Sequence, residues 1–160
     1  MKIPGEANFG EQWILDKRKT KNPVDPYRPY GFFLEKERTL SGKVQEVITV
    51  FLTNRECRFR CLMCDLWKNT TDKPVPVGAI PAQIEYALEK LPPAKHLKLY
   101  NSANFFDPVC VPAEDYQRIA ALAGKFDTLI VENHPKLTGE RINQVLSRLF
   151  WFEIVQSQED

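Results

Sequence analysis

An alternation of short apolar runs and helix-like segments constrains the fold of this chain most strongly. Residues Val44–Thr53 are dense in β-branched and apolar side chains, and this run is short enough to be a buried strand rather than a helix. Leu97–Tyr100 and Thr128–Val131 have the same character. A fourth strand is predicted over Phe150–Val155. Such a succession predicts an α/β fold with three to four parallel strands.

Helical patterns occupy the intervals between these runs. Over residues 81–91, apolar positions recur at helical spacing, with Pro81 in the first turn and two prolines ending the run. A second helix is predicted over Ala113–Gly124, closed by its glycine. A third is predicted over residues 138–149, with Thr138 as its cap. Right-handed crossovers would place the carboxyl ends of all strands at one edge, where functional groups gather.

Composition restricts the domain organisation and the partners. The chain has 160 residues, 43% of them hydrophobic, which is enough for one domain. Residues 1–40 are rich in proline, basic and aromatic residues and are predicted to form an irregular arm leading into a domain over residues 41–160. Lysine and arginine total 22 against 21 acids, so net charge indicates neither nucleic acid nor an anionic membrane as an obligatory partner.

The amino-terminal segment has no continuous hydrophobic region of the kind found in signal peptides, and no apolar run reaches the roughly 18 residues of a membrane span. We therefore expect a cytoplasmic protein with no membrane partner. Four cysteines in such a compartment are expected to stay reduced. Metal ligation or catalysis then explains them better than disulfides do.

Three of these cysteines, Cys57, Cys61 and Cys64, lie within eight residues directly after the first predicted strand. Thiolates are the preferred ligands of iron-sulfur clusters, and a closely spaced loop can bind three irons of a cube while the fourth stays open. The alternatives are a zinc site completed by Cys110 or a histidine, or thiols brought together by chance. A structural zinc usually takes four ligands at a different spacing, which favours the cluster.

The spacing C-x3-C-x2-C and its place after the first strand resemble the radical S-adenosylmethionine superfamily. The resemblance implies the front portion of a partial (β/α)6 TIM-like barrel, with Cys57, Cys61 and Cys64 holding a 4Fe-4S cluster. It also implies S-adenosylmethionine bound at the open iron and cleaved by one electron to methionine and a 5′-deoxyadenosyl radical. An electron donor such as flavodoxin or ferredoxin would be a partner. Arg58 and Arg60 could tune the cluster's potential, or could simply be solvated.

Five further positions are candidate S-adenosylmethionine contacts by the same resemblance. Met63 stands where the family commonly has an aromatic residue near the adenine, and its flexible side chain could make a similar contact. Asn101, Ser102 and Asn104 stand where many members bind the methionyl amino group, although these residue types also favour a plain turn. Glu132, at the end of the third predicted strand, would face the cofactor or cap the next turn.

The segments Leu99–Asp107 and Val131–Lys136 look like a subgroup that contains the Elongator catalytic subunit and archaeosine-related radical enzymes. Because that subgroup acts on tRNA, tRNA becomes a candidate partner. Basic residues of the arm, interleaved with two tyrosines, could contact phosphate and stack on bases, or could form a charged, solvated arm. These residues are Lys17, Arg18, Lys19, Lys21 and Arg28, with Tyr27 and Tyr30.

The resemblance covers the chain from about Val44 onward and only the front half of a six-stranded core. Half a barrel cannot enclose the cofactor or exclude water from a radical. We therefore expect a chain that binds the cluster but turns over poorly alone, and a second chain could complete the barrel. A non-catalytic zinc- or iron-binding module is the alternative function.

Overall fold

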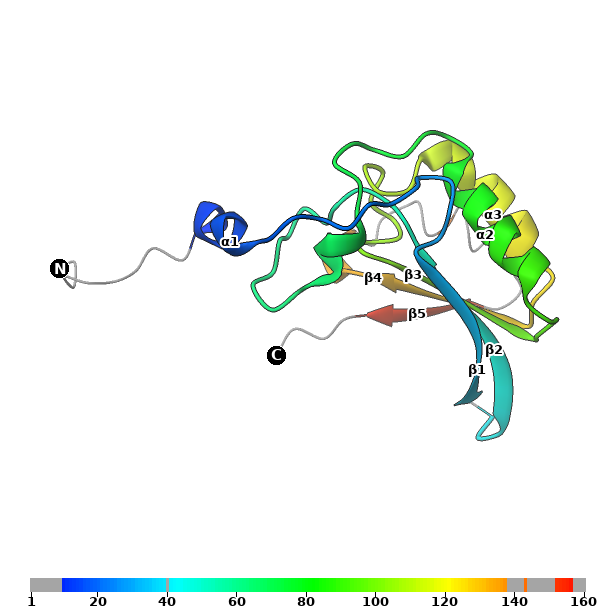
Figure 1. The fold of residues 1–160 in the computed structure, drawn as a ribbon. Helices are drawn as coiled ribbons and strands as arrows, with labels where there is room; N and C mark the ends of the chain where they lie inside the picture. The colour runs from blue at the N-terminus through cyan, green and yellow to red at the C-terminus, as the bar shows by residue number, and fades with distance from the viewer. Residues whose placement is uncertain (1–9, 40, 138–142, 144–151, 157–160) are drawn as a thin grey trace.

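A computed structural model describes residues 10–39, 41–137, 143 and 152–156. It contains a five-stranded sheet in the order β1-β2-β3-β4-β5, shown in Figure 1. β1 pairs with β2 in antiparallel fashion, and β2 to β5 are parallel to one another. The strands are β1 (Gly31–Arg38), β2 (Val44–Leu52), β3 (His96–Asn101), β4 (Thr128–Asn133) and β5 (Phe152–Gln156).

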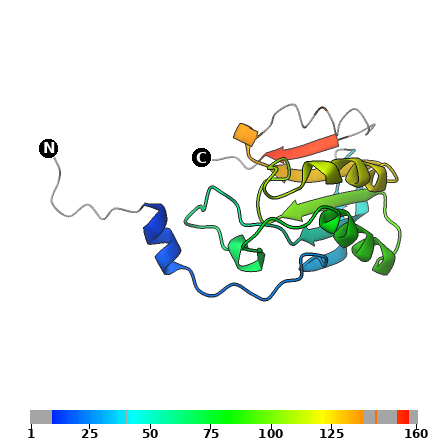
Figure 2. The same cartoon turned by 90° about the horizontal axis from the view of Figure 1, so that it is seen from above.

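Two helices cross between the parallel strands, and Figures 1 and 2 show them side by side on one face of the sheet. α2 (Ala79–Lys90) joins β2 to β3, and η2 (Ala113–Asp115) with α3 (Tyr116–Ala123) joins β3 to β4. Gly78 precedes α2 with φ 88°, a conformation that glycine adopts without strain. Shorter helices are α1 (Glu11–Lys17), η1 (Leu66–Asn69) and η3 (Pro135–Leu137).

The helix-facing side of the sheet carries the hydrophobic core. Ile48, Val50 and Leu52 alternate along β2 and pack with Leu99 of β3 and Ile84 of α2, all in one buried cluster. Alternation with period two puts these side chains on a single face. Burying each such side chain contributes about 1.5–3 kcal/mol. The apolar side chains of the predicted strands and helices therefore form a core between one face of the sheet and the helices that cover it.

The opposite side of the sheet carries a group of charged residues, and we call this side the open face. Its central residue is Lys98, which is only 4% exposed and forms ion pairs with Glu35, at 3.3 Å, and with Glu37. Within the described residues, the helices that pack on the sheet lie on the other side. The polar residues of the open face are Glu35, Glu37, Thr49, Lys98, Tyr100 and Glu132, and the strand register places apolar Phe33, Val47, Phe51 and Ile130 on the same face.

The α/β architecture and the parallel order are confirmed, as are the predicted strands and the two helices that fall in the described part of the chain. The helix predicted over residues 138–149 lies outside the described residues, apart from position 143. The irregular arm predicted over residues 1–40 is wrong for α1 and for β1. β1 pairs with β2 along its whole length, because the turn at Gly42, with φ 76°, folds the chain back on itself.

Candidate functional site

The cysteine loop, residues 53–65, leaves the sheet at the carboxyl end of β2. A turn in which the Cys64 amide donates to the Cys61 carbonyl at 3.2 Å brings the last two cysteines together. Arg60 adopts φ 48°, a left-handed conformation that is uncommon for a side chain of this kind and that fixes the approach to Cys61. Cys61 is exposed, whereas Cys57 and Cys64 are half-buried.

Asn104 connects the cysteine loop to two strand ends. Its Nδ2 donates to Cys57 Sγ at 3.3 Å, and its Oδ1 accepts from the His134 amide at 2.7 Å. Burial, with smaller contributions from Cys61 and Cys64, raises the pKa of the Cys57 thiol, although hydrogen bonds from the Phe59 backbone and from Asn104 act in the opposite direction. Asn104, one of the predicted cofactor contacts, thus forms a hydrogen bond to a cysteine sulfur in the structure.

Arg58 and Phe59 anchor the loop to the segments that follow β3 and β4. Arg58 forms a two-pronged ion pair with the buried carboxylate of Asp107, with both N···O distances at 2.7 Å. The Phe59 ring stacks on His134, with 4.3 Å between the ring centroids. A paired guanidinium and a stacked ring both restrict a loop that would otherwise be mobile.

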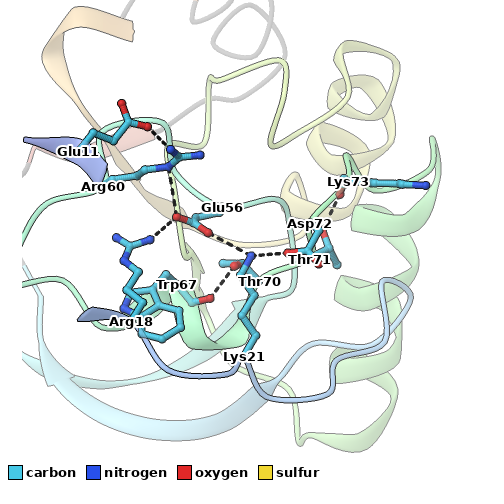
Figure 3. Close-up of polar contacts among 10 residues, drawn as sticks. All are labelled: Glu11, Arg18, Lys21, Glu56, Arg60, Trp67, Thr70, Thr71, Asp72 and Lys73. Carbon is cyan, nitrogen blue, oxygen red and sulfur yellow. Dashed lines mark hydrogen bonds and ion pairs between the residues drawn. The ribbon is translucent and has the colours of Figure 1, made fainter. Parts of the chain in front are cut away.

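A second set of ion pairs fixes the loop to the amino-terminal arm, and Figure 3 shows its centre at Glu56. Glu56 directly precedes Cys57 and pairs with Arg18, with Lys21 at 3.1 Å, and with Arg60 at 3.6 Å. Lys21 also reaches Asp72 at 2.8 Å. The arm therefore lies along the cysteine loop, held by a carboxylate that three cations share.

Replacing Glu56 by glutamine is expected to loosen this attachment. Surface ion pairs contribute about 0–1 kcal/mol each, and three pairs on one half-buried carboxylate should together cost about 1–2 kcal/mol of unfolding free energy. Urea denaturation measures the loss, and faster proteolysis between Arg18 and Lys21 would locate it. Glu85→Gln removes the partner of Arg118 on exposed helix surfaces and should change stability by less than about 0.5 kcal/mol. Equal effects of the two substitutions would contradict a special role for Glu56.

The basic arm is largely engaged within the chain. Arg18 lies over the Trp67 ring at 5.1 Å as well as pairing with Glu56, and Arg28 lies over the Tyr86 ring at 4.1 Å. Lys21 is bound to two carboxylates, and Lys17 lies over the Trp13 ring at 5.5 Å, so four of the five basic residues proposed for tRNA contact have partners in the described structure. These four residues are therefore not freely solvated in the described structure.

Tyr30, Ser102 and Glu132 lie together where the open face meets the cysteine loop. Ser102 Oγ donates to Tyr30 OH at 3.3 Å. Burial raises the pKa of Tyr30, and the hydrogen bond from Ser102 lowers it. The nearby charges of Glu132 and Cys64 raise it further. Burial also raises the pKa of Glu132, which Lys98 partly offsets. Ser102 and Glu132 are predicted site residues that the fold brings together, whereas the sequence pattern places Tyr30 only on the arm.

The other predicted contacts have different surroundings. Met63 is 88% exposed, so its contact with an adenine stays a prediction. Asn101 is 1% exposed, and neither its Oδ1 nor its Nδ2 has a hydrogen-bond partner among the described residues. The side-chain amide of Asn54, directly after β2, is in the same state. Buried amides normally bond to protein, water or a ligand, so the carboxyl edge offers polar groups to a bound molecule.

Within the part of the chain that the structure describes, no three histidine, cysteine or acidic side chains are gathered closely enough to hold a single metal ion. A single ion requires its ligands to converge on one point. A four-iron cube differs, because each thiolate binds a different iron. The candidate ligands of such a cube are therefore the three thiols of one loop. One of them, Cys57, already accepts a hydrogen bond from the side-chain amide of Asn104.

The cysteines should differ in reactivity toward iodoacetamide in the metal-free chain. Exposed Cys61 should react first and half-buried Cys57 more slowly. Cys110 should not react at pH 8 until the chain unfolds, because burial raises the pKa of its thiol to about 12 and the thiolate is the nucleophile. Peptide mapping after timed alkylation measures the order. Rapid labelling of Cys110 in the folded chain would contradict its burial.

Comparison with known proteins identifies no relative. No protein-family model matches the chain, and no curated protein and no solved structure matches it significantly. None of the described helices has the length and apolar character needed to cross a membrane. The function is therefore inferred from the residues and their geometry.

Proposed function

We propose that this chain is a radical S-adenosylmethionine protein, or the cluster-bearing part of one, in which Cys57, Cys61 and Cys64 bind a 4Fe-4S cluster. The observation that carries the proposal is the placement of the C-x3-C-x2-C loop, which begins at the carboxyl end of β2, the first strand of the parallel set. Ligand sites in parallel α/β sheets lie at this edge.

The residues around the loop suit such a group. Three thiols can occupy three irons and leave the fourth open. Asn104 would orient Cys57 and donate a hydrogen bond to its sulfur, which is one way in which proteins tune iron-sulfur potentials. Phe59, stacked on His134, would keep water from one side of the loop. When bound, the cluster would supply the electron that cleaves S-adenosylmethionine to methionine and a 5′-deoxyadenosyl radical.

The binding place for S-adenosylmethionine follows from the polar groups at the same edge. Ser102, Tyr30 and Glu132 lie beside Cys64 and can hydrogen-bond a polar ligand. The amides of Asn54 and Asn101 have no partner among the described residues, and a buried polar group left unpaired costs about 1–3 kcal/mol. A ligand that bonds these amides would recover that cost.

The charged residues of the open face favour a partial TIM-like barrel. They argue against the alternative, a sheet that helices cover on both sides. A parallel sheet covered by helices on both faces is apolar on both. Here Lys98, Glu35 and Glu37 occupy the second face, as expected for the wall of a polar cavity. The antiparallel β1 occupies the free edge of β2, so further strands would add next to β5. A second chain that supplies them would complete the enclosure.

Anaerobic reconstitution followed by a 5′-deoxyadenosine assay tests the catalytic part of the proposal. With dithionite, or with flavodoxin or ferredoxin as the electron donor, the reconstituted chain should release 5′-deoxyadenosine from S-adenosylmethionine slowly, because an open half-barrel admits water. A Cys61→Ser chain treated identically is the control and should release none. No release beyond this control under any of these donors would contradict the radical chemistry, and fast turnover by the monomer would contradict the open half-barrel.

A further inference from the structure

A polar pocket lies on the side of the cysteine loop that faces the arm. Its volume is about 420 Å³, close to the lower end of the range for small-molecule sites. Walls from four parts of the chain form it: the arm, the start of the cysteine loop, the segment of Thr71 and Asp72, and the segment after β3. The charged residues that line it are Glu11, Lys21, Arg55, Glu56, Arg58, Arg60, Asp72 and Asp107.

Every carboxylate of this pocket already has a cationic partner. Asp107 is held by Arg58, Asp72 by Lys21, and Glu11 by Arg60. Glu56 is shared among Arg18, Lys21 and Arg60, as Figure 3 shows. The pocket therefore contains no carboxylate that is still available to balance another positive charge.

Arg55 is the cation that remains. It is half-buried, it lines the pocket, and within the described structure its side chain forms no ion pair or hydrogen bond. Arg18 also reaches Glu56 from outside the lining. With Arg18 included, the charged residues at the pocket are five cations and four carboxylates, so they carry one excess positive charge. Partial burial removes some of the water that hydrates the Arg55 guanidinium, and no carboxylate of the described structure compensates for that loss. This favours the binding of an anionic ligand.

We propose that this pocket binds a phosphate group through Arg55. A guanidinium presents parallel N–H donors that match two phosphate oxygens at once. Lys21 and Arg60, which share Glu56 with Arg18, flank the same space and add to its positive potential. The pocket is larger than one inorganic anion, so the phosphate belongs to a phosphorylated small molecule or to an RNA backbone. Cys57 also lines the pocket, but the proposed phosphate contact is with Arg55 and not with a cysteine thiol.

Isothermal titration of the full-length chain with inorganic phosphate and with ribose 5-phosphate, at constant ionic strength, tests the site. Arg55→Gln should weaken both affinities about tenfold or more, and Arg55→Lys should give an intermediate loss, because charged hydrogen bonds contribute about 1.5–3 kcal/mol. Arg118→Gln removes an arginine that pairs with Glu85 on the exposed helices and should leave both affinities unchanged. Unaltered far-UV circular dichroism would show that the variants fold.

A tRNA titration separates the two sources of the phosphate. If the source is RNA, Arg55→Gln weakens tRNA binding and lowers its salt dependence. If the source is a small molecule, Arg55→Gln weakens ribose 5-phosphate binding by the same factor of about ten or more and leaves tRNA binding as in the original chain. Absence of binding to all three probes, or equal binding by the original chain and Arg55→Gln, would overturn the proposal.

Discussion

Replacing Cys61 by serine is expected to remove most of the iron that the chain can bind. A three-thiol loop holding a cube should take up about four irons and four sulfides per chain after anaerobic reconstitution, and one missing ligand leaves a second iron without protein coordination. We expect less than about one iron per chain in Cys61→Ser, with the same result for Cys57→Ser and Cys64→Ser. Iron and acid-labile sulfide analysis measures this directly. Cys61 is the best first choice because it is exposed, so its substitution should not disturb the core.

Cys110→Ser is the matched control for the same experiment. Cys110 lines the pocket next to Cys57, yet it is buried and its thiol pKa is raised to about 12, as expected of a small core residue. The variant should keep its iron. Loss of metal in Cys110→Ser comparable to that in Cys61→Ser would contradict the three-cysteine assignment and favour a four-ligand site that includes Cys110.

Lys98→Met is expected to destabilise the fold more than any other single charge removal on the sheet. It would leave Glu35 and Glu37 facing each other without the cation that both contact. Breaking a fully buried pair costs about 3–5 kcal/mol, but these carboxylates are 31% and 37% exposed, so solvent screening reduces the expected loss to about 1–3 kcal/mol. Urea denaturation at pH 7 measures it. Lys95→Met, whose exposed pair with Asp127 spans 4.0 Å, should cost less than about 0.5 kcal/mol.

The pH dependence of this effect has a definite sign. Burial pushes the pKa of Lys98 down, but the hydrogen bond to Glu37 and the charges of Tyr100, Glu35 and Glu37 outweigh it, so the pKa lies above its ordinary value. A raised lysine pKa contributes stability that is fully present below about pH 10.4 and is lost as the pH rises through the folded-state pKa. The Lys98→Met loss should therefore be undiminished at pH 7. Adding Glu37→Gln should restore part of it, and identical stabilities of Lys98→Met and the original chain would contradict the network.

The apolar strands and helices could be predicted because their signal is local. Val44–Thr53 has its apolar pattern in ten consecutive residues, and only its last residue falls outside β2. β1 was missed because its segment GFFLEKER ends in four consecutive charged residues, and the partner of Glu35 and Glu37 is Lys98, about sixty residues away in sequence. Lys98 itself is visible as a lysine within an apolar strand, but its partners lie in the segment predicted to be irregular.

The candidate site divides in the same way. The spacing of Cys57, Cys61 and Cys64 is contained in one loop, so sequence could predict it. The contacts of Asn104 with Cys57 and of Arg18 with Glu56 join segments about forty to fifty residues apart, and no local pattern specifies them. The family resemblance predicted Asn104 to lie near the ligand, whereas its residue type alone also allowed a plain turn. Its hydrogen bond to sulfur required the fold.

Metal and sulfide analysis of the original chain tests the central claim most directly. The chain is isolated without oxygen from cells supplied with both iron and zinc, and its metals are counted against protein. A 4Fe-4S cluster on Cys57, Cys61 and Cys64 predicts about four irons and four sulfides per chain, with a low-temperature electron paramagnetic resonance signal in the reduced state that changes when S-adenosylmethionine is added. One zinc per chain, with neither iron nor sulfide, would contradict it.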